Sequence, residues 1–198
     1  MSRRKGARDI ISHANSIKMP VRAPDQSTTA AGTIERLNFS IRDAAANEYL
    51  QLTVLAQRAK AHWGYPPDRM AEWSAQLTIS PEYIARHRVE VAVDDAMRVV
   101  GMCSLEDHGD HFQLEHVWID PAAQRIGIGS TLVRRALLAA SERPVPVRLL
   151  ADQYAEGFYE RLGAQVVGTQ PAPMPGDPER SLPVMEFRTK ASSASNSA

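Results

Sequence analysis

The sequence has little cysteine, no net charge and no long apolar run, and each shortage excludes a class of protein. Its one cysteine, Cys103, cannot form an internal disulfide, which suits a reducing compartment. The 23 basic residues are balanced by 23 acidic ones, so the chain creates no bulk field that attracts nucleic acid or an anionic membrane. No apolar run approaches the roughly 20 residues that a membrane-spanning helix needs. The basic residues Arg3 to Lys5 are followed by no apolar segment, so no secretory signal is expected. We therefore expect a cytoplasmic protein with no nucleic-acid or membrane partner.

What is present is typical of a folded domain with polar ends. The chain has 198 residues, of which 43% are hydrophobic and 23% charged, which is ordinary for a globular protein. Residues 1–33 show little core pattern beyond a weak helix around Asp9 to Ile17, so we expect a flexible N-terminal extension. Residues 190–198 are of low complexity and are expected to be a disordered tail. The domain itself should span 34–189.

Within this domain the apolar spacing alternates between helical and extended periods. A helix from Asp43 or Asn47 to about His62 should bury Tyr49, Leu52, Leu55, Ala56 and Ala59. Pro67 can start a short second helix, and Ser80 opens another helical turn. The expected strands cover 37–41, 89–93, 99–103, 112–119, 145–150, 165–168 and 184–188. This order predicts an α+β domain with a central mixed, mostly antiparallel sheet of about six or seven strands, flanked by about four helices.

The stretch from Leu114 to Ala139 organises the domain. An extended run ends at Asp120-Pro121, where proline stops the ladder because it has no N–H. Gly127 and Gly129 follow, and then an apolar stripe at helical spacing. The pattern therefore predicts a strand, a glycine loop and a helix. The first turn of such a helix presents unpaired N–H groups and the positive end of the helix dipole, which together form an anion site.

Three families of glycine loop compete for this stretch. A dinucleotide fingerprint needs a third glycine at the position of Leu132. A P-loop needs a lysine directly after a glycine, and no lysine follows Gly127 or Gly129. The run Gln124-Arg125-Ile126-Gly127-Ile128-Gly129 resembles the Gln/Arg-x-x-Gly-x-Gly/Ala loop of the GNAT superfamily of N-acetyltransferases. In that family the loop binds the pyrophosphate of acetyl-CoA. The resemblance implies that the backbone of Gln124, Arg125, Ile126, Gly127, Ile128, Gly129 and Ser130 binds the coenzyme.

A second stretch, 151–164, is similar to a later motif of the same family, in which Asn-x-x-Ala leads into a helix bearing Phe-Tyr-x-x-Leu-Gly-Phe. Here the residues are Asp152-x-x-Ala155 and Phe158-Tyr159-x-x-Leu162-Gly163-Ala164. Gly163 is a natural C′ residue for that helix. Asp152 and Ala164 depart from the family pattern. We expect Asp152 beside the pantetheine, with one hydrogen bond in question because a carboxylate only accepts. The resemblance covers about Phe39 to Arg188.

The resemblance implies direct transfer of an acetyl group from acetyl-CoA to a primary amine of a small molecule or peptide in a ternary complex. Tyr159 would be the acid that protonates the departing thiolate. Glu115 is the candidate base, since it shares a strand face with Val117 and Ile119, where desolvation raises a carboxyl pKa. Strict alternation puts Leu114, His116 and Trp118 on the other face, and His116 is the second candidate base. Backbone groups around Val117, Trp118 and Ile119 would orient the pantetheine.

Other readings stay open. A non-catalytic acyl-CoA-binding or sensor module needs the glycine loop but neither Tyr159 nor a base, and a longer acyl donor or an aminoacyl donor is also compatible. Residues 60–65 are either part of the acceptor pocket or the packed end of an amphipathic helix. Arg180 has the chemistry to bind an acceptor carboxylate, but we interpret it as a surface arginine.

Two further features are interpreted as structural. Residues 107–111 have metal-binding types but suit a solvated hairpin turn, and the proposed chemistry needs no metal. Cys103 is expected to be a small buried residue rather than a nucleophile. The sequence leaves the oligomeric state open, and a homodimer is the commonest assembly on base rates. The identity of the acceptor amine is not encoded in any pattern that we recognise.

Overall fold

The computed structural model describes residues 38–188, so the expected N-terminal extension and C-terminal tail lie outside the described residues. The chain order of the described elements is β1 (Phe39–Asp43), η1 (Ala46–Glu48), α1 (Tyr49–Ala61), α2 (Pro67–Glu72), α3 (Pro81–Arg86), β2 (Arg88–Asp94), β3 (Val99–Asp107), β4 (Phe112–Ile119), η2 (Pro121–Ala123), α4 (Ile128–Ala140), β5 (Val147–Leu150), α5 (Glu156–Arg161), β6 (Gln165–Pro171) and β7 (Ser181–Phe187). The expected mixed α+β architecture is confirmed. None of the helices in this part of the chain is long and apolar enough to cross a membrane.

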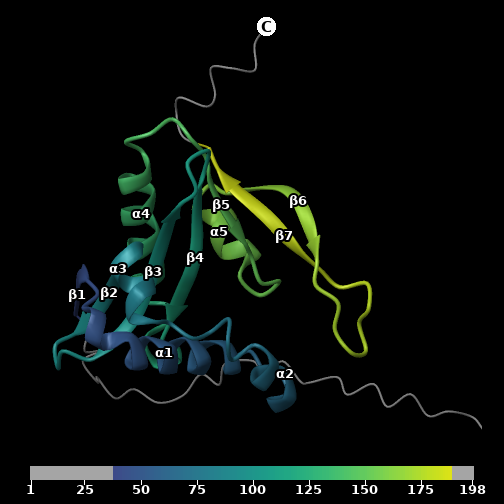
Figure 1. The fold of residues 1–198 in the computed structure, drawn as a ribbon, viewed down its shortest axis with the longest axis horizontal. Coiled ribbons are helices and arrows are strands. Elements are labelled where there is room, and N and C mark those ends of the chain that lie inside the picture. Colours follow the sequence, from purple (N-terminus) through teal and green to yellow (C-terminus); the bar gives the residue numbers. More distant parts are fainter. Residues whose placement is uncertain (1–37, 189–198) are drawn as a thin grey trace, which may run out of the picture. The chain divides into compact units, whose positions relative to one another are not determined.

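The seven described strands form one sheet in the order β1-β2-β3-β4-β5-β7-β6 (Figure 1). All neighbours are antiparallel except β4 and β5, which run parallel. Parallel neighbours need a crossover connection, and α4 supplies it. The parallel pair therefore stands in the middle of the sheet, directly after the strand–loop–helix segment that organises the sequence.

Helices cover both faces of the sheet, and each face has its own hydrophobic core. The first core joins α1 and α3 to β2 and β3 through Leu52, Leu55, Ile79, Ile84, Val89, Val91, Val93, Val99 and Met102. The second joins α4 and α5 to the middle strands, and Ile128, Leu132, Val133, Ala136 and Ala140 of α4 are its helical contribution. The buried side chains of α1 and α4 follow the predicted helical period, except that Tyr49 at the start of α1 is only partly buried. A three-layer arrangement follows, since an amphipathic helix buries its apolar stripe against the sheet.

Gly101 in β3 sets how closely α4 approaches the sheet. A Cβ built at this position would lie 2.8 Å from Cγ2 of Ile128 and 3.0 Å from Cδ1 of Ile119. Because no side chain stands there, the first turn of α4 packs directly on the strand backbone. The start of α4, where the glycine loop ends, is thus held against β3 and β4.

The last hairpin is longer than the sequence predicts. The expected strands 165–168 and 184–188 become β6 and β7, which pair from Gln165 with Glu186 as far as Pro171 with Ser181. Pro171 is tolerated because β6 is the outermost strand, where a missing N–H leaves no ladder bond unmade. The hairpin therefore extends well beyond β5, on the far side of the parallel pair (Figure 1).

The parallel pair itself is short. Only Phe112 with Val147 and Gln113 with Arg148 are in register, both at the beginnings of their strands. Beyond these two pairs β4 and β5 separate, so the sheet forks toward the ends at which both strands finish. We call this opening the fork.

Candidate active site

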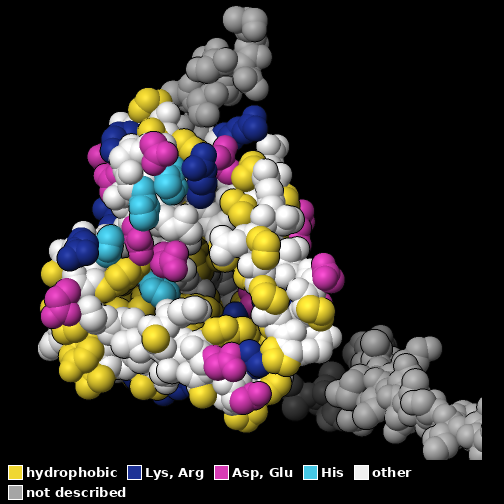
Figure 2. Space-filling model, turned by 45° about the vertical axis from the view of Figure 1, so that its right-hand side comes forward, with side chains coloured by type: hydrophobic (Ala, Val, Ile, Leu, Met, Phe, Trp, Pro, Cys, Tyr) yellow, Lys and Arg dark blue, Asp and Glu magenta, His cyan; other side chains and the backbone are white. Residues whose placement is uncertain are grey.

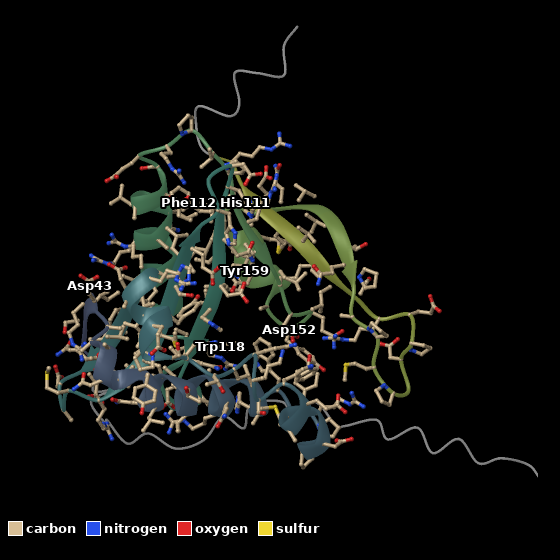
Figure 3. The ribbon with its side chains drawn as sticks, in the orientation of Figure 1. Asp43, His111, Phe112, Trp118, Asp152 and Tyr159 are labelled. Atoms are coloured by element: carbon tan, nitrogen blue, oxygen red, sulfur yellow. The ribbon has the colours of Figure 1, made fainter. Side chains whose placement is uncertain are left out.

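A cleft of about 850 Å³ fills the fork. Its walls come from β4, the glycine loop, the start of α4, the end of β5, α5 and the last turn of α1. Figure 2 shows the surface hollowed here, with acidic and histidine side chains gathered along one side of the hollow. In Figure 3, Tyr159 lies inside the fork, and Trp118 and Asp152 lie nearer to α1 and α2.

One wall of the cleft is an unpaired strand edge. Asp120 donates its N–H to the carbonyl of Val100 in β3, at 2.9 Å. Because successive residues of a strand direct their N–H groups to opposite edges, Val117 and Ile119 direct theirs away from β3, toward the fork. No residue of β5 is in register with either of them. These backbone groups are therefore free to bind an extended molecule lying in the cleft.

A β-bulge in β4 corrects the expected alternation. Cys103 pairs with Val117 and Leu105 with Leu114, so Glu115 and His116 together oppose Ser104. The hydroxyl of Ser104 is fully buried and accepts the N–H of His116 at 3.0 Å. The extra residue shifts the pattern, and Leu114 packs in the same core as Val117 and Ile119 rather than with His116 and Trp118. Two expectations were therefore wrong, that Leu114 shares a face with His116 and that Glu115 shares one with Val117 and Ile119, because alternation holds only in an unbroken ladder. Glu115 instead shares its face with Gln113, whose amide donates to its carboxylate at 3.4 Å.

The glycine loop presents a run of unpaired amides. Arg125 and Gly127 both have left-handed backbones, with φ of 67° and 95°. The N–H of Thr131 donates to the carbonyl of Gly127 at 3.0 Å, which closes the first turn of α4. Across the part of the chain that the structure describes, the N–H groups of residues 124–130 donate to no protein acceptor. Together with the dipole of a 13-residue helix, they make this loop suited to a diphosphate.

Nearly all residues expected at the site border the cleft. The set comprises Glu115, Val117, Trp118, Ile119, Gln124, Arg125, Gly127, Ile128, Gly129, Ser130, Asp152 and Tyr159. Ile126 is not among the lining residues, and its side chain is 41% exposed. Only the backbone of Ile126 remains a candidate for coenzyme binding.

Tyr159 lies at the junction of the cleft and the second core. It is 8% exposed and comes from α5, beside Phe158. Phe158 in turn packs against the start of α4, where a Cβ at Gly129 would lie 3.3 Å from its Cζ. Burial raises the pKa of the Tyr159 hydroxyl well above its usual value. The hydroxyl therefore keeps its proton at neutral pH.

Glu115 has the environment of a base. Glu115 is exposed at the cleft, but the surrounding protein still removes its carboxyl partly from water and raises its pKa, and the negative charge of Glu106 raises it further. Glu106 itself accepts a hydrogen bond from the hydroxyl of Tyr83 at 2.7 Å. A carboxylate whose pKa is shifted toward neutrality takes up a proton more readily than an ordinary surface glutamate.

His116 is less suited to this role. Burial lowers its pKa to about 4, so the ring is neutral at pH 7. Its Nδ1 lies 3.1 Å from Nε1 of Trp118, and an indole nitrogen can only donate. The proton of the neutral imidazole is therefore on Nε2, and no ring nitrogen remains to accept another. His116 packs between Tyr83 and Trp118 and is not among the residues that line the cleft.

Asp152 is the anion of a buried charge cluster that we define as Lys60, Tyr65, Asp152 and Arg180. Lys60 Nζ lies 2.6 Å from Asp152 Oδ2, and Arg180 Nη2 lies 3.9 Å from the same oxygen. The Tyr65 hydroxyl, whose pKa is raised by burial and by Asp152, donates to both carboxylate oxygens at 3.0 and 2.9 Å. The Asp152 side chain is 8% exposed. A carboxylate at this position is thus explained by its two cationic neighbours.

Aromatic rings enclose the lysine of this cluster. Lys60 Nζ lies 5.3 Å from the ring centre of Trp63 and 4.8 Å from those of Tyr65 and Trp73. Tyr154 packs against Trp63 and Tyr65 at 5.7 and 6.0 Å between ring centres. Such contacts stabilise a cation by about 0.5–2 kcal/mol each, depending on how far it is removed from water.

Arg180 is not the surface arginine that the sequence suggests, since its side chain is 6% exposed. Its Nη1 donates to the carbonyl of Ala172 at 3.1 Å and its Nη2 to the Tyr65 hydroxyl at 3.4 Å. Its Nε is buried and has no acceptor among the described residues.

Cys103 and residues 107–111, which we interpreted as structural, lie where the sequence predicts. Cys103 is buried in the second core, and burial raises the pKa of its thiol. Residues 107–111 form the turn between β3 and β4, in which Asp107 accepts the N–H of Gly109 at 2.8 Å and pairs with Arg143.

Several cleft residues were not singled out from the sequence. They are Gln113, Leu150, Tyr154, Ala155, Phe158, Arg161, Gln170 and Leu182. Phe158 and Ala155 were part of the second motif, but only as helix-face residues. Gln170 and Leu182 come from β6 and β7, whose approach to the fork depends on sheet order rather than on any local pattern.

Comparison with known proteins is consistent with this geometry. A family model described as an acetyltransferase (GNAT) domain matches residues 85–163. The uncharacterized N-acetyltransferase YafP of Escherichia coli strain K12 is 30% identical over 138 residues, covering 67% of this chain and 85% of the relative.

Solved structures show the same fold at lower identity. The PaiA N-acetyltransferase of Thermoplasma acidophilum, in complex with coenzyme A, has a TM-score of 0.62 at 18% identity, covering 77% of this chain and 99% of its own. The yncA structure from Salmonella typhimurium, with its cofactor acetyl-CoA, has a TM-score of 0.58 at 17% identity, covering 81% and 99%.

Proposed function

Because this chain belongs to the GNAT family of acetyltransferases, we propose that it moves an acetyl group from acetyl-CoA to a primary amine of a small molecule or a peptide. The observation that carries the proposal is the combination of the fork with the unpaired amides of residues 124–130. The open strand edge in the fork suits an extended chain with amide groups, and the unpaired amides suit a diphosphate. The pantetheine and pyrophosphate of coenzyme A are joined in this way.

The residues present fit the coenzyme. The amides of residues 124–130 would bind the pyrophosphate, with Arg125 adding positive charge. Val117 and Ile119 would pair with the pantetheine amides along the open edge of β4, as a neighbouring strand would. When bound, acetyl-CoA supplies the thioester whose acetyl group is transferred. The bound chain would be aligned by the same backbone that aligns the sheet.

Tyr159 is proposed as the general acid. Its buried, protonated hydroxyl borders the cleft from α5, opposite the β4 wall. Donating a proton to the departing sulfur prevents the thiolate from attacking the product. Cys103, the one cysteine of the chain, is a protonated thiol in the core, which favours direct transfer to the amine over an acyl-cysteine route.

Glu115 is proposed as the general base. An alkyl amine with a pKa near 10.4 is neutral in only about one molecule in 10³ at pH 7, so attack on the thioester requires that a proton be removed. Glu115 borders the cleft at the bulge, and its raised pKa makes it a better proton acceptor than an ordinary carboxylate. It would take the proton directly or through a water molecule.

The proposal is tested with acetyl-CoA and a panel of amines. Calorimetry should show binding of acetyl-CoA, and thiol release should accompany acetylation of at least one amine. Tyr159→Phe should lower kcat by about 10²–10⁴ while the Kd for acetyl-CoA stays the same, since the ring and its packing are kept. Unchanged turnover in Tyr159→Phe would remove the acid assignment. Binding without any turnover would identify a coenzyme-binding module, and the absence of binding would refute the proposal altogether.

A further inference from the structure

The charge cluster holds two cations and one carboxylate. Among the described residues, neither Lys60 nor Arg180 forms an ion pair with any carboxylate other than Asp152. Both side chains are largely buried, at 14% and 6% exposure. Buried charges in proteins are normally matched by opposite charges, because an unmatched ion loses its hydration without compensation. The cluster thus lacks one negative charge.

Its hydrogen-bonding capacity is also incomplete. An ammonium has three donors, and Lys60 uses one of them on Asp152. The rings of Trp63, Tyr65 and Trp73 stabilise the charge but accept no conventional hydrogen bond. The buried Nε of Arg180 has no acceptor. An anionic ligand group in the cleft would supply the missing charge and acceptors for the two remaining donors of Lys60, which borders the cleft, whereas Arg180 is not among the lining residues.

The cluster opens onto the cleft on the arm of the fork formed by β5. Lys60 and Asp152 border the cleft together with Trp63, Tyr154, Gln170 and Leu182. These residues come from the last turn of α1, the α1–α2 connection, the β5–α5 connection and the last hairpin, whereas the glycine loop follows β4. The two features that attract anions therefore lie at the ends of different strands. The rings and Leu182 provide an apolar surface beside the charge.

We propose that the charge cluster is the acceptor-recognition site and that it selects amines that also carry a carboxylate, the amino-acid class of acceptor. This inference rests on the proposed acetyltransferase function. The acceptor carboxylate binds Lys60 Nζ and neutralises the cluster, while Trp63 and Tyr154 cover the apolar part of the acceptor. The amine then extends from the cluster into the fork, toward Tyr159 and Glu115.

Pairs of acceptors that differ only in the carboxylate test the inference. Phenylalanine with phenethylamine, and methionine with 3-(methylthio)propylamine, are suitable pairs. We expect kcat/KM for the amino acid to exceed that for the plain amine by about tenfold or more, as for a hydrogen bond to a charged group. Equal values, or a preference for the plain amine, would overturn the inference even if every amine is acetylated.

Lys60→Met keeps the apolar stem within the rings and removes the charge. It should abolish the preference by lowering kcat/KM for the amino acid alone, and Lys60→Arg should restore part of it. An equal loss for both acceptors would assign a merely structural role to Lys60. A weaker Kd for acetyl-CoA with no change in acceptor preference would show that the surplus charge serves the coenzyme phosphates instead. Either result overturns the inference but leaves the proposed acetyltransferase function standing, which fails only if no amine is acetylated.

Discussion

Asp152→Asn replaces the carboxylate by the amide that the wider family usually has at this position, and we expect it to destabilise this protein. The exchange keeps the shape and an acceptor for the Tyr65 hydroxyl, but it leaves Lys60 and Arg180 without any anion. Removing one partner of a buried ion pair costs about 3–5 kcal/mol. The rings around Lys60 retain about 0.5–2 kcal/mol of cation–π attraction. The net loss should therefore be about 2–4 kcal/mol.

The assay is urea unfolding at pH 7, supported by thermal unfolding. For a domain of this size the loss corresponds to a decrease in Tm of roughly 5–15 °C. The denaturant midpoint should fall while the m-value stays the same, because the surface exposed on unfolding is unchanged. A protein with typical stability of about 5–15 kcal/mol remains folded after this substitution.

A double-mutant cycle with Lys60→Met shows whether the pair is the cause. Removing both charges leaves a neutral side chain among the rings, so the double variant should be at least as stable as Asp152→Asn alone. We expect a coupling energy of about 2 kcal/mol between the two sites, within the range found for contacting residues. Additive losses, or an Asp152→Asn variant within 0.5 kcal/mol of the parent as surface substitutions usually are, would refute the reasoning.

Three further predictions follow from the site. Gly127→Ala should lower the free energy of unfolding by about 1–2 kcal/mol because φ there is 95°, and calorimetry should show weaker acetyl-CoA binding. Gly129→Ala should leave the free energy of unfolding nearly unchanged, because that backbone is helical and only Phe158 must shift. The kcat/KM of the parent should fall as the pH is lowered through the raised pKa of Glu115, above the ordinary value of 4.5, and Glu115→Gln should be slow at every pH. The pKa of His116 is lowered from 6.5 to about 4 in the folded state, so the unfolded chain binds the extra proton between these values and stability falls as the pH drops. Urea unfolding should show a loss of about 2 kcal/mol from this group between pH 7 and pH 5, which His116→Gln removes.

Local patterns were sufficient for most of the fold. The helical stripe of α4 and the buried side of α1 are readable because an amphipathic helix repeats its contacts every three or four residues. Gly163 was expected to end α5, and it has a left-handed backbone with φ of 101°. The glycine loop, which we propose binds the diphosphate, was also predicted from the sequence, because its strand, two glycines and helix are adjacent in the chain.

Features that depend on distant partners were not readable. The bulge at Glu115 and His116 is stabilised by the Ser104 hydroxyl of the neighbouring strand. The residues of β4 alone do not predict this bulge. The charge cluster joins Lys60 to Asp152 across 92 residues and brings in Arg180 from the last hairpin. Such groups become visible only when sheet order is known, because long-range assembly, not periodicity, brings them together.

Because only two residue pairs join β4 to β5, the stability of the folded chain should depend on whether the proposed coenzyme is bound. In the free protein the backbone groups along the fork must be hydrated, so one seam of the sheet contributes no ladder energy. If the proposed coenzyme lies in that opening, it would supply the missing hydrogen bonds, and at 100 times its Kd it would add about 2.7 kcal/mol to the free energy of unfolding.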